Sequence, residues 1–189
     1  MTGLGIFGGS FDPPHNAHMD IATLATERIP LDTLYFVPSY QAPLKSQPPV
    51  ASARHRLAMV TLLAQMRPGW QVLAYELDQK RPVATIETVR FLRRRHLRAD
   101  FYLLIGGDQA AQFHHWQQWE QLAEMVQIVC FTREPPTPVA SLANRLMVVD
   151  YNVPLSSSLI RERVKKGSST DTMLPSAIQA YIREHRLYR

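Results

Sequence analysis

His15 and His18 lie three positions apart, shortly after the first apolar residues of the chain. We expect Asn16 to cap a helix that begins at the next residue, which would place His18 in its first turn. The free N–H groups and the dipole of a helix start attract phosphate, and two histidines there can donate hydrogen bonds to the same anion. Gly8 and Gly9 precede them and let the backbone approach a ligand closely. The segment GGSFDPPHNAH therefore predicts a phosphate-binding turn.

Other interpretations of this segment fit less well. GLGIFG matches the dinucleotide pattern G-x-G-x-x-G, but only two residues precede it and no acidic residue ends the second strand, LYFV. The phosphate-loop pattern G-x-x-x-x-G-K-[ST] does not occur. A zinc site lacks the glutamate of H-E-x-x-H and an evident third ligand, so we predict no protein-held metal. Ordinary loop histidines remain an alternative, which the crowding of glycine, proline and histidine disfavours.

The rest of the chain alternates apolar runs with helical patterns. This alternation predicts an α/β fold with a parallel sheet and helices on both faces, and ligands in such sheets bind beyond the carboxyl ends of the strands. Residues 134–145 are rich in proline, threonine and alanine and predict a surface loop. The predicted strands are 3–7, 34–37, 71–75, 101–105, 126–131 and 146–149, and the predicted helices lie within 51–66, 84–96, 117–125, 156–167 and 174–189.

Three of these helices carry finer signals. Gly167 suits the end of the helix in 156–167, and Pro175 suits the first turn of the last helix. The helix in 51–66 should bury one face, made of Met59, Leu62, Leu63 and Met66.

Composition restricts the class of protein. The 189 residues carry a formal net charge of +5, which suits a polyanionic ligand without separating ATP from nucleic acid. No apolar run could span a membrane, and the start of the chain lacks the features of a secretion signal. Cys130 is the single cysteine and predicts a buried thiol in the cytoplasm. RFLRRRH is read as a solvated face, with a basic nucleic-acid-binding protein as the alternative.

Five segments in order resemble the bacterial nicotinate-nucleotide adenylyltransferases of the H-x-G-H nucleotidyltransferase superfamily. They are GGSFDPPHNAH, in which Ala17 replaces the usual glycine, VPSYQAPLK, ATIETV, GGDQAAQFHHWQQWEQL, and SSSLIRERVKKG with YIREHRLYR. The resemblance implies a Rossmann-like fold in one domain over residues 1–189. It also implies adenylyl transfer from ATP to nicotinate mononucleotide with Mg2+, which yields nicotinate adenine dinucleotide and pyrophosphate for NAD biosynthesis. No membrane or nucleic-acid partner is expected, and the oligomeric state is left open.

The same resemblance implies a role for each candidate residue. His15 and His18 would contact the phosphates of ATP, and Lys45 would add charge at the acceptor side or the triphosphate. Asp108 would reach a ribose hydroxyl, while Thr85 would lie near the nicotinate carboxylate and Trp116 against its ring. The remaining residues would line the ATP site or hold the triphosphate: Gly8, Gly9, Ser10, Phe11, Gly106, Ser157, Ser158 and Arg161.

Structural alternatives stand beside these roles. Ser157, Ser158 and Asp108 could be helix caps, and Trp116 could belong to the core. The family often has P-H-K where this chain has Pro43, Leu44 and Lys45, and S-Y-T where it has Val83, Ala84 and Thr85. Both departures concern the acceptor side. SSSLI also resembles pantetheine-phosphate adenylyltransferase, which is the second enzyme class considered.

Overall fold

Six parallel strands form one sheet in the computed structural model, which describes residues 2–43, 47–132, 142 and 145–189. The strands are β1 (Gly3–Gly9), β2 (Thr33–Pro38), β3 (Trp70–Val72), β4 (Asp100–Gly106), β5 (Gln127–Phe131) and β6 (Leu146–Val149). All six predicted strands are confirmed. The third is shorter than predicted, because the chain turns into a helix at Tyr75.

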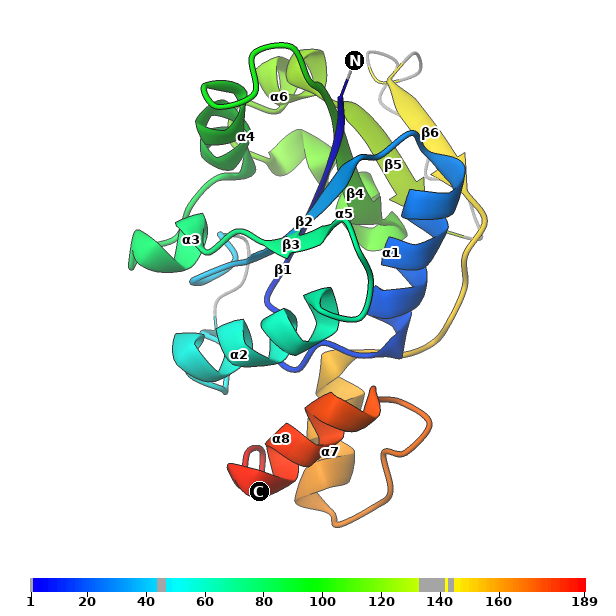
Figure 1. Cartoon of the computed structure of the whole chain (residues 1–189). Helices are drawn as coiled ribbons and strands as arrows, with labels where there is room; N and C mark the ends of the chain where they lie inside the picture. Colours follow the sequence, from blue (N-terminus) through cyan, green and yellow to red (C-terminus); the bar gives the residue numbers. More distant parts are fainter. Residues whose placement is uncertain (1, 44–46, 133–141, 143–144) are drawn as a thin grey trace.

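Helices connect the strands and close the chain (Figure 1). They are α1 (Asn16–Arg28), α2 (Ala53–Ala64), α3 (Tyr75–Asp78), α4 (Thr85–Arg93), α5 (Gly107–Ala111), the 3-10 turn η1 (Phe113–His115), α6 (Trp119–Met125), α7 (Ser157–Lys165) and α8 (Ser176–Glu184). Gly167 follows the end of α7 with a positive φ of 67°, as predicted. Pro175 is the residue before α8 rather than in its first turn.

The strand order is β3-β2-β1-β4-β5-β6, so β1 has β2 on one side and β4 on the other. This is the Rossmann-like order, which reverses direction between β1 and β4. The crevice outside the carboxyl ends of these two strands is where such folds bind ligands. The predicted phosphate-binding turn follows β1 and thus lies at this crevice.

Alternating side chains of the strands build a core on each face of the sheet. On β5, Val129 and Phe131 join the core beneath α1 and α2, whereas Ile128 and Cys130 join the core beneath α4 and α6. Cys130 is fully buried, as expected, and its burial raises the pKa of the thiol to about 11. Both faces of the sheet are therefore covered, and this explains the nearly continuous apolar strands.

The C-terminal helices belong to the first of these cores. Ile160 of α7 and both Ile178 and Ile182 of α8 are buried in it, and α8 packs on α2. Figure 1 shows α7 and α8 side by side below the sheet, next to the chain that enters α1. The end of the chain is thereby brought to the predicted phosphate-binding turn.

One face of α2 differs from the prediction. Met59 and Leu63 are buried and Leu62 packs against the core, but Met66 lies beyond the end of the helix and is 47% exposed. The buried face includes Arg56 instead, three positions before Met59. No helix in the described ranges is long and apolar enough to cross a membrane.

Candidate active site

The turn after β1 brings the two histidines together. The residue that precedes α1 is His15 rather than Asn16, whose side chain instead donates to the carbonyl of Thr172 at 2.9 Å. The rings of His15 and His18 stack with their centroids 3.7 Å apart. The prediction that His18 lies in the first turn of α1 is confirmed, whereas the prediction that Asn16 caps this helix is wrong.

One hydrogen bond orients the ring of His18. The backbone N–H of His15 donates to Nδ1 of His18 at 3.2 Å, so Nδ1 is an acceptor. In the neutral ring the proton is then on Nε2, because one imidazole nitrogen donates while the other accepts. His18 is half-buried, with Phe11 against its ring at 4.9 Å. It therefore offers an oriented N–H donor.

His15 is more enclosed. Only 5% of it is exposed, and burial lowers its pKa from 6.5 to about 4, so the ring is neutral near pH 7. Its Nδ1 is buried and has no hydrogen-bond partner within the described part of the chain. A buried polar atom of this kind is uncommon in proteins and is often explained by a functional role.

Two glycines leave open space at the carboxyl ends of β1 and β4, where the strand order of the sheet reverses. A Cβ added to Gly8 at the end of β1, or to Gly106 at the end of β4, would meet no atom within 4 Å. Packing in this structure therefore does not require glycine at these positions, and the space beside both backbones is available to a ligand. Gly9 differs, since a Cβ there would come within 3.2 Å of the Phe11 ring.

Phe11 itself belongs to the core. It is 1% exposed and packs edge-on against Phe7 and Phe36, with a positive φ of 48° that is rare for a bulky residue. Only its backbone could line a nucleotide site, while its side chain supports the ring of His18. Ser10 precedes it, and its carbonyl accepts a hydrogen bond from Arg56 Nη1 at 2.8 Å.

The start of α7 docks against this turn through two side-chain hydrogen bonds. Arg161 Nη1 donates to the carbonyl of Asp12 at 2.7 Å, and Arg161 Nη2 donates to Ser158 Oγ at 3.1 Å. Ser157 Oγ donates to the carbonyl of Pro13 at 2.9 Å. The residue that caps α7 is Ser156, whose hydroxyl accepts from the N–H of Leu159, so neither Ser157 nor Ser158 is the cap.

These contacts divide the two serines. The hydrogen of the Ser157 hydroxyl is used within the protein, whereas the Ser158 hydroxyl accepts from Arg161 and, like any hydroxyl, can also donate. Arg161 has five N–H donors, of which the two contacts use a part. The free N–H groups at the start of α7 add a partial positive charge beside them.

The predicted acceptor residues lie on the other face of the sheet. Thr85 is the first residue of α4 and is half-buried. Trp116 follows η1 and packs on Phe113 with their centroids 5.1 Å apart, half-buried against the core. Helix α4 is joined to α6, because Arg90 Nη2 of α4 donates at 2.8 Å to the side-chain oxygens of Gln118 and Gln121 at the start of α6.

A carboxylate already occupies part of the α4 start. Glu87 accepts from the N–H of Ala84 at 3.1 Å and pairs with Arg81 at 2.7 Å. The amides of Thr85 and Ile86 lie in the first helical turn, where no carbonyl of the same helix can accept from them. Asp108 is exposed in the first turn of α5 and is not its cap, since Gly106 is. Lys45 and Leu44 lie outside the described residues.

Three residues of the site were missed in the sequence. Asp12 is buried within the turn, and Arg56 is buried beside it and donates to the carbonyl of Ser10. Tyr188 reaches Asp12 from the end of the chain. Arg56 had a signal, because it lies on the same helical face as Met59. Nothing in the local pattern distinguished Asp12 or Tyr188.

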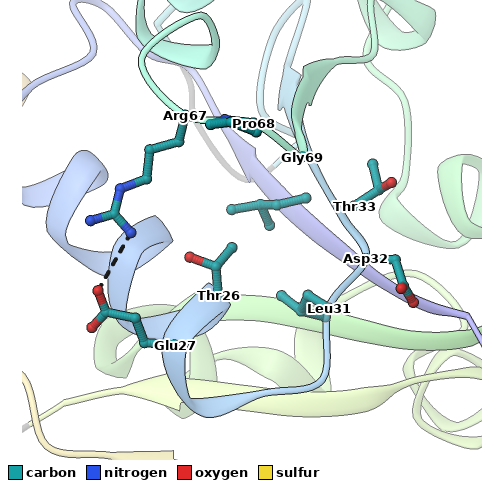
Figure 2. A pocket seen from close by; sticks show the side chains of 9 residues that line it. Thr26, Glu27, Leu31, Asp32, Thr33, Arg67, Pro68 and Gly69 are labelled. Atoms are coloured by element: carbon teal, nitrogen blue, oxygen red, sulfur yellow. Dashed lines mark hydrogen bonds and ion pairs between the residues drawn. The ribbon is translucent and has the colours of Figure 1, made fainter.

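A separate hollow of about 360 Å3 lies at the opposite edge of the sheet (Figure 2). It is found where α1 ends and β2 and β3 begin, so it faces the amino ends of the strands. Its charged side chains are engaged within the protein: Glu27 pairs with Arg67 at 3.4 Å, and Asp32 accepts from the N–H of Gly3 at 2.7 Å. This hollow is therefore distinct from the candidate active site.

The chain is similar to known proteins in both sequence and fold. A cytidylyltransferase-like family model matches residues 6–163. A protein of Bacillus pumilus described as a probable nicotinate-nucleotide adenylyltransferase is 34% identical over 189 residues, covering 100% of this chain and 99% of its own length. A protein of Salinibacter ruber with the same description is 32% identical over 98% of this chain and 97% of its own.

The fold also has solved relatives. Nicotinic acid mononucleotide adenylyltransferase of Plasmodium falciparum, solved in complex with NaAD, superposes with a TM-score of 0.79 over 100% of this chain and 98% of its own. A putative nicotinate-nucleotide adenylyltransferase of Vibrio parahaemolyticus superposes with a TM-score of 0.72 over 100% of this chain and 96% of its own. The identities are 19% and 17%, so these two structures establish the shared Rossmann-like fold.

Proposed function

The chain belongs to the nicotinate-nucleotide adenylyltransferases within the cytidylyltransferase-like family, and from this membership we propose that it transfers the adenylyl group of ATP to nicotinate mononucleotide. The products are nicotinate adenine dinucleotide and pyrophosphate, and the reaction serves NAD biosynthesis. The observation that carries the proposal is the docking of the α7 start against the histidine turn, with Arg161 Nη1 2.7 Å from the carbonyl of Asp12. The N–H-rich start of α7 is thereby held against the turn that follows β1, and a Cβ added to Gly8 of this strand would meet no atom within 4 Å.

The chemistry needs no base from the protein. The second ionisation of a phosphate monoester has a pKa of about 6, so the acceptor's 5′-phosphate is a dianion near pH 7. One of its oxygens forms a bond to the α-phosphorus of ATP, while the bond from this phosphorus to the bridging oxygen breaks and its electron pair leaves with pyrophosphate. The barrier comes from repulsion between two anions and from charge that develops on pyrophosphate. Positioning and fixed donors lower that barrier.

We assign the donors by geometry. His18 would donate from Nε2 to the phosphates, because its Nδ1 accepts from the N–H of His15. Arg161, Ser158 and the amides at the start of α7 would hold the leaving pyrophosphate portion. Ser157 would act through its backbone, since its hydroxyl is bonded to Pro13. Lys45 keeps the role that the resemblance implies. Gly8, Gly9, Ser10, Phe11 and Gly106 would shape the nucleotide site, and Asp108, Thr85 and Trp116 would contact ribose and nicotinate.

Mg2+ fits this site as part of the substrate. The described residues include no group of three or more histidine, cysteine, aspartate or glutamate side chains that could hold a metal ion. Mg2+ commonly keeps several waters and binds substrate phosphates with few protein ligands, so the donor set here suits magnesium-bound ATP. The ion would neutralise phosphate charge. We also propose a cytoplasmic location, which a single buried free thiol suits.

The test is pyrophosphate release from magnesium-bound ATP with a panel of acceptors. We expect turnover with nicotinate mononucleotide and formation of nicotinate adenine dinucleotide, identified by mass. Equal or greater turnover with phosphopantetheine would instead assign the chain to the pantetheine-phosphate class. Release of pyrophosphate without any acceptor would contradict both assignments.

A further inference from the structure

The carboxylate of Asp12 is buried within the predicted phosphate-binding turn, which also carries His15 and His18. Asp12 is 3% exposed, and its oxygens accept from the N–H of Val50 at 2.7 Å, the N–H of Ala51 at 3.0 Å and the hydroxyl of Tyr188 at 2.8 Å. Arg161 Nη1 is 3.8 Å away and also donates to the carbonyl of Asp12. A carboxylate removed from water is costly unless donors replace its hydration, so these contacts fix its position.

Asp12 is linked to His18 and to the start of α7 through its two neighbours in the chain. Its neighbour Phe11 supports the ring of His18 at 4.9 Å, and its other neighbour Pro13 accepts from Ser157. On the far side, Arg56 Nη1 holds the carbonyls of Ser10 and Ser39 at 2.8 and 2.6 Å. A displacement of Asp12 would therefore move the supports of both His18 and the α7 start.

One of the donors to Asp12 comes from the end of the chain. Tyr188 is the penultimate residue and lies 176 positions from Asp12. After α8 the chain folds back, with Arg186 and Tyr188 at positive φ values of 51° and 63°. Residues other than glycine rarely adopt this conformation, which persists where surrounding contacts hold it. The backbone N–H of Leu187 donates to the carbonyl of Ile182 at 3.0 Å, and the Tyr188 side chain packs on the core.

We infer that Tyr188 is a positioning residue for the adenylyl transfer proposed above, on which this inference rests. Its hydroxyl holds the Asp12 carboxylate, and through Asp12 the turn that carries His15 and His18, in the geometry that the reaction needs. The hydroxyl is a constant donor, because burial and the neighbouring carboxylate hold the pKa of Tyr188 above its ordinary value. The catalytic turn is complete only when the end of the chain is docked.

The test is Tyr188→Phe, which removes one oxygen and keeps the ring. The matched control is Tyr181→Phe, which removes a hydroxyl that lies 3.0 Å from Nδ1 of His55, a residue of α2 outside the turn. We expect kcat of Tyr188→Phe to fall about tenfold or more, since misplacement by about 1 Å can cost about 100-fold. KM for nicotinate mononucleotide should change less than twofold, and the control should keep kcat within twofold. Assays run at least 15 °C below both melting temperatures separate positioning from unfolding.

Hydrogen exchange measured by mass spectrometry gives a readout that does not depend on activity. The amides of Asn16, His18 and Met19 donate to the carbonyls of Met173 and His15. The peptide that contains these amides should exchange at least about tenfold faster in Tyr188→Phe than in the parent. Its exchange should be unchanged in Tyr181→Phe. Unchanged exchange, or kcat within twofold of the parent, would overturn the inference. Faster exchange in Tyr188→Phe, found together with a parent protein that is inactive with every pyridine mononucleotide, would support the contact and refute the proposed function.

Discussion

Glu76 of α3 is a buried acid beside the start of α4, and its replacement should stabilise the protein only at high pH. It is 7% exposed and accepts a hydrogen bond from Thr88 Oγ1 at 2.8 Å. Burial raises the pKa of Glu76 from 4.5 to about 7, against the opposing effect of that hydrogen bond. One pKa unit is worth 1.36 kcal/mol, so the ionised carboxylate costs the folded state about 3 kcal/mol.

The sign follows from the two pKa values. Between pH 4.5 and 7 the folded state keeps a proton that the unfolded state has lost, so the free energy of unfolding falls as pH rises through this range. Glu76→Gln keeps the shape and an oxygen acceptor for Thr88 but cannot ionise. Its free energy of unfolding should match the parent within about 1 kcal/mol at pH 4.5 and exceed it by up to about 3 kcal/mol at pH 8.5.

Urea unfolding followed by circular dichroism at both pH values measures this difference. Glu184→Gln, at the exposed end of α8, is the matched control and should shift stability by less than about 0.5 kcal/mol at either pH. The comparison must be made between variant and parent, because His15 acts in the opposite direction. Its pKa is lowered to about 4, so its contribution to stability is lost as pH falls from 6.5 towards 4. A Glu76→Gln effect that is the same at both pH values would refute the reasoning and indicate a solvated carboxylate.

Four further predictions concern the reaction. His18→Ala should lower kcat about 100-fold or more in steady-state assays. It should also cost about 1 kcal/mol of stability, because the ring packs on His15 and Phe11. Near-normal kcat would indicate a purely structural role. Gly8→Ala should leave the melting temperature unchanged, since its Cβ meets no atom, yet raise KM for ATP about tenfold by filling the nucleotide space; an unchanged KM would move ATP elsewhere. Arg161→Lys should lower kcat/KM about 10- to 150-fold, because lysine cannot hold Asp12, Ser158 and a phosphate together; full activity would exclude the guanidinium from the site. The parent should prefer nicotinate over nicotinamide mononucleotide at least about 100-fold in kcat/KM, since the amides at the α4 start favour a carboxylate; similar values would show that this segment does not recognise it.

The sequence by itself determined the layers of this protein and the segment that forms its candidate site. Six apolar runs between helical patterns predicted six parallel strands, because side-chain periodicity is a local property that each segment carries alone. GGSFDPPHNAH predicted a phosphate-binding turn after the first strand, since glycine, proline and histidine limit the conformation and chemistry of their own segment. The end of α7 at Gly167 followed from the same kind of local signal.

Only the tertiary structure decided what holds that turn in place. Asp12 is bonded to residues 38, 39 and 176 positions away, and no local pattern relates segments so far apart. The cap of α1 was predicted one residue late, because Asn16 is drawn to the carbonyl of Thr172 instead. Arg56 is buried where an apolar face predicted only hydrophobic side chains, because the backbone carbonyls of the turn, Ser39, Tyr40 and Ala51 surround its guanidinium. A buried polar group is stable only where distant segments supply its partners, and packing of the whole chain decides where that happens.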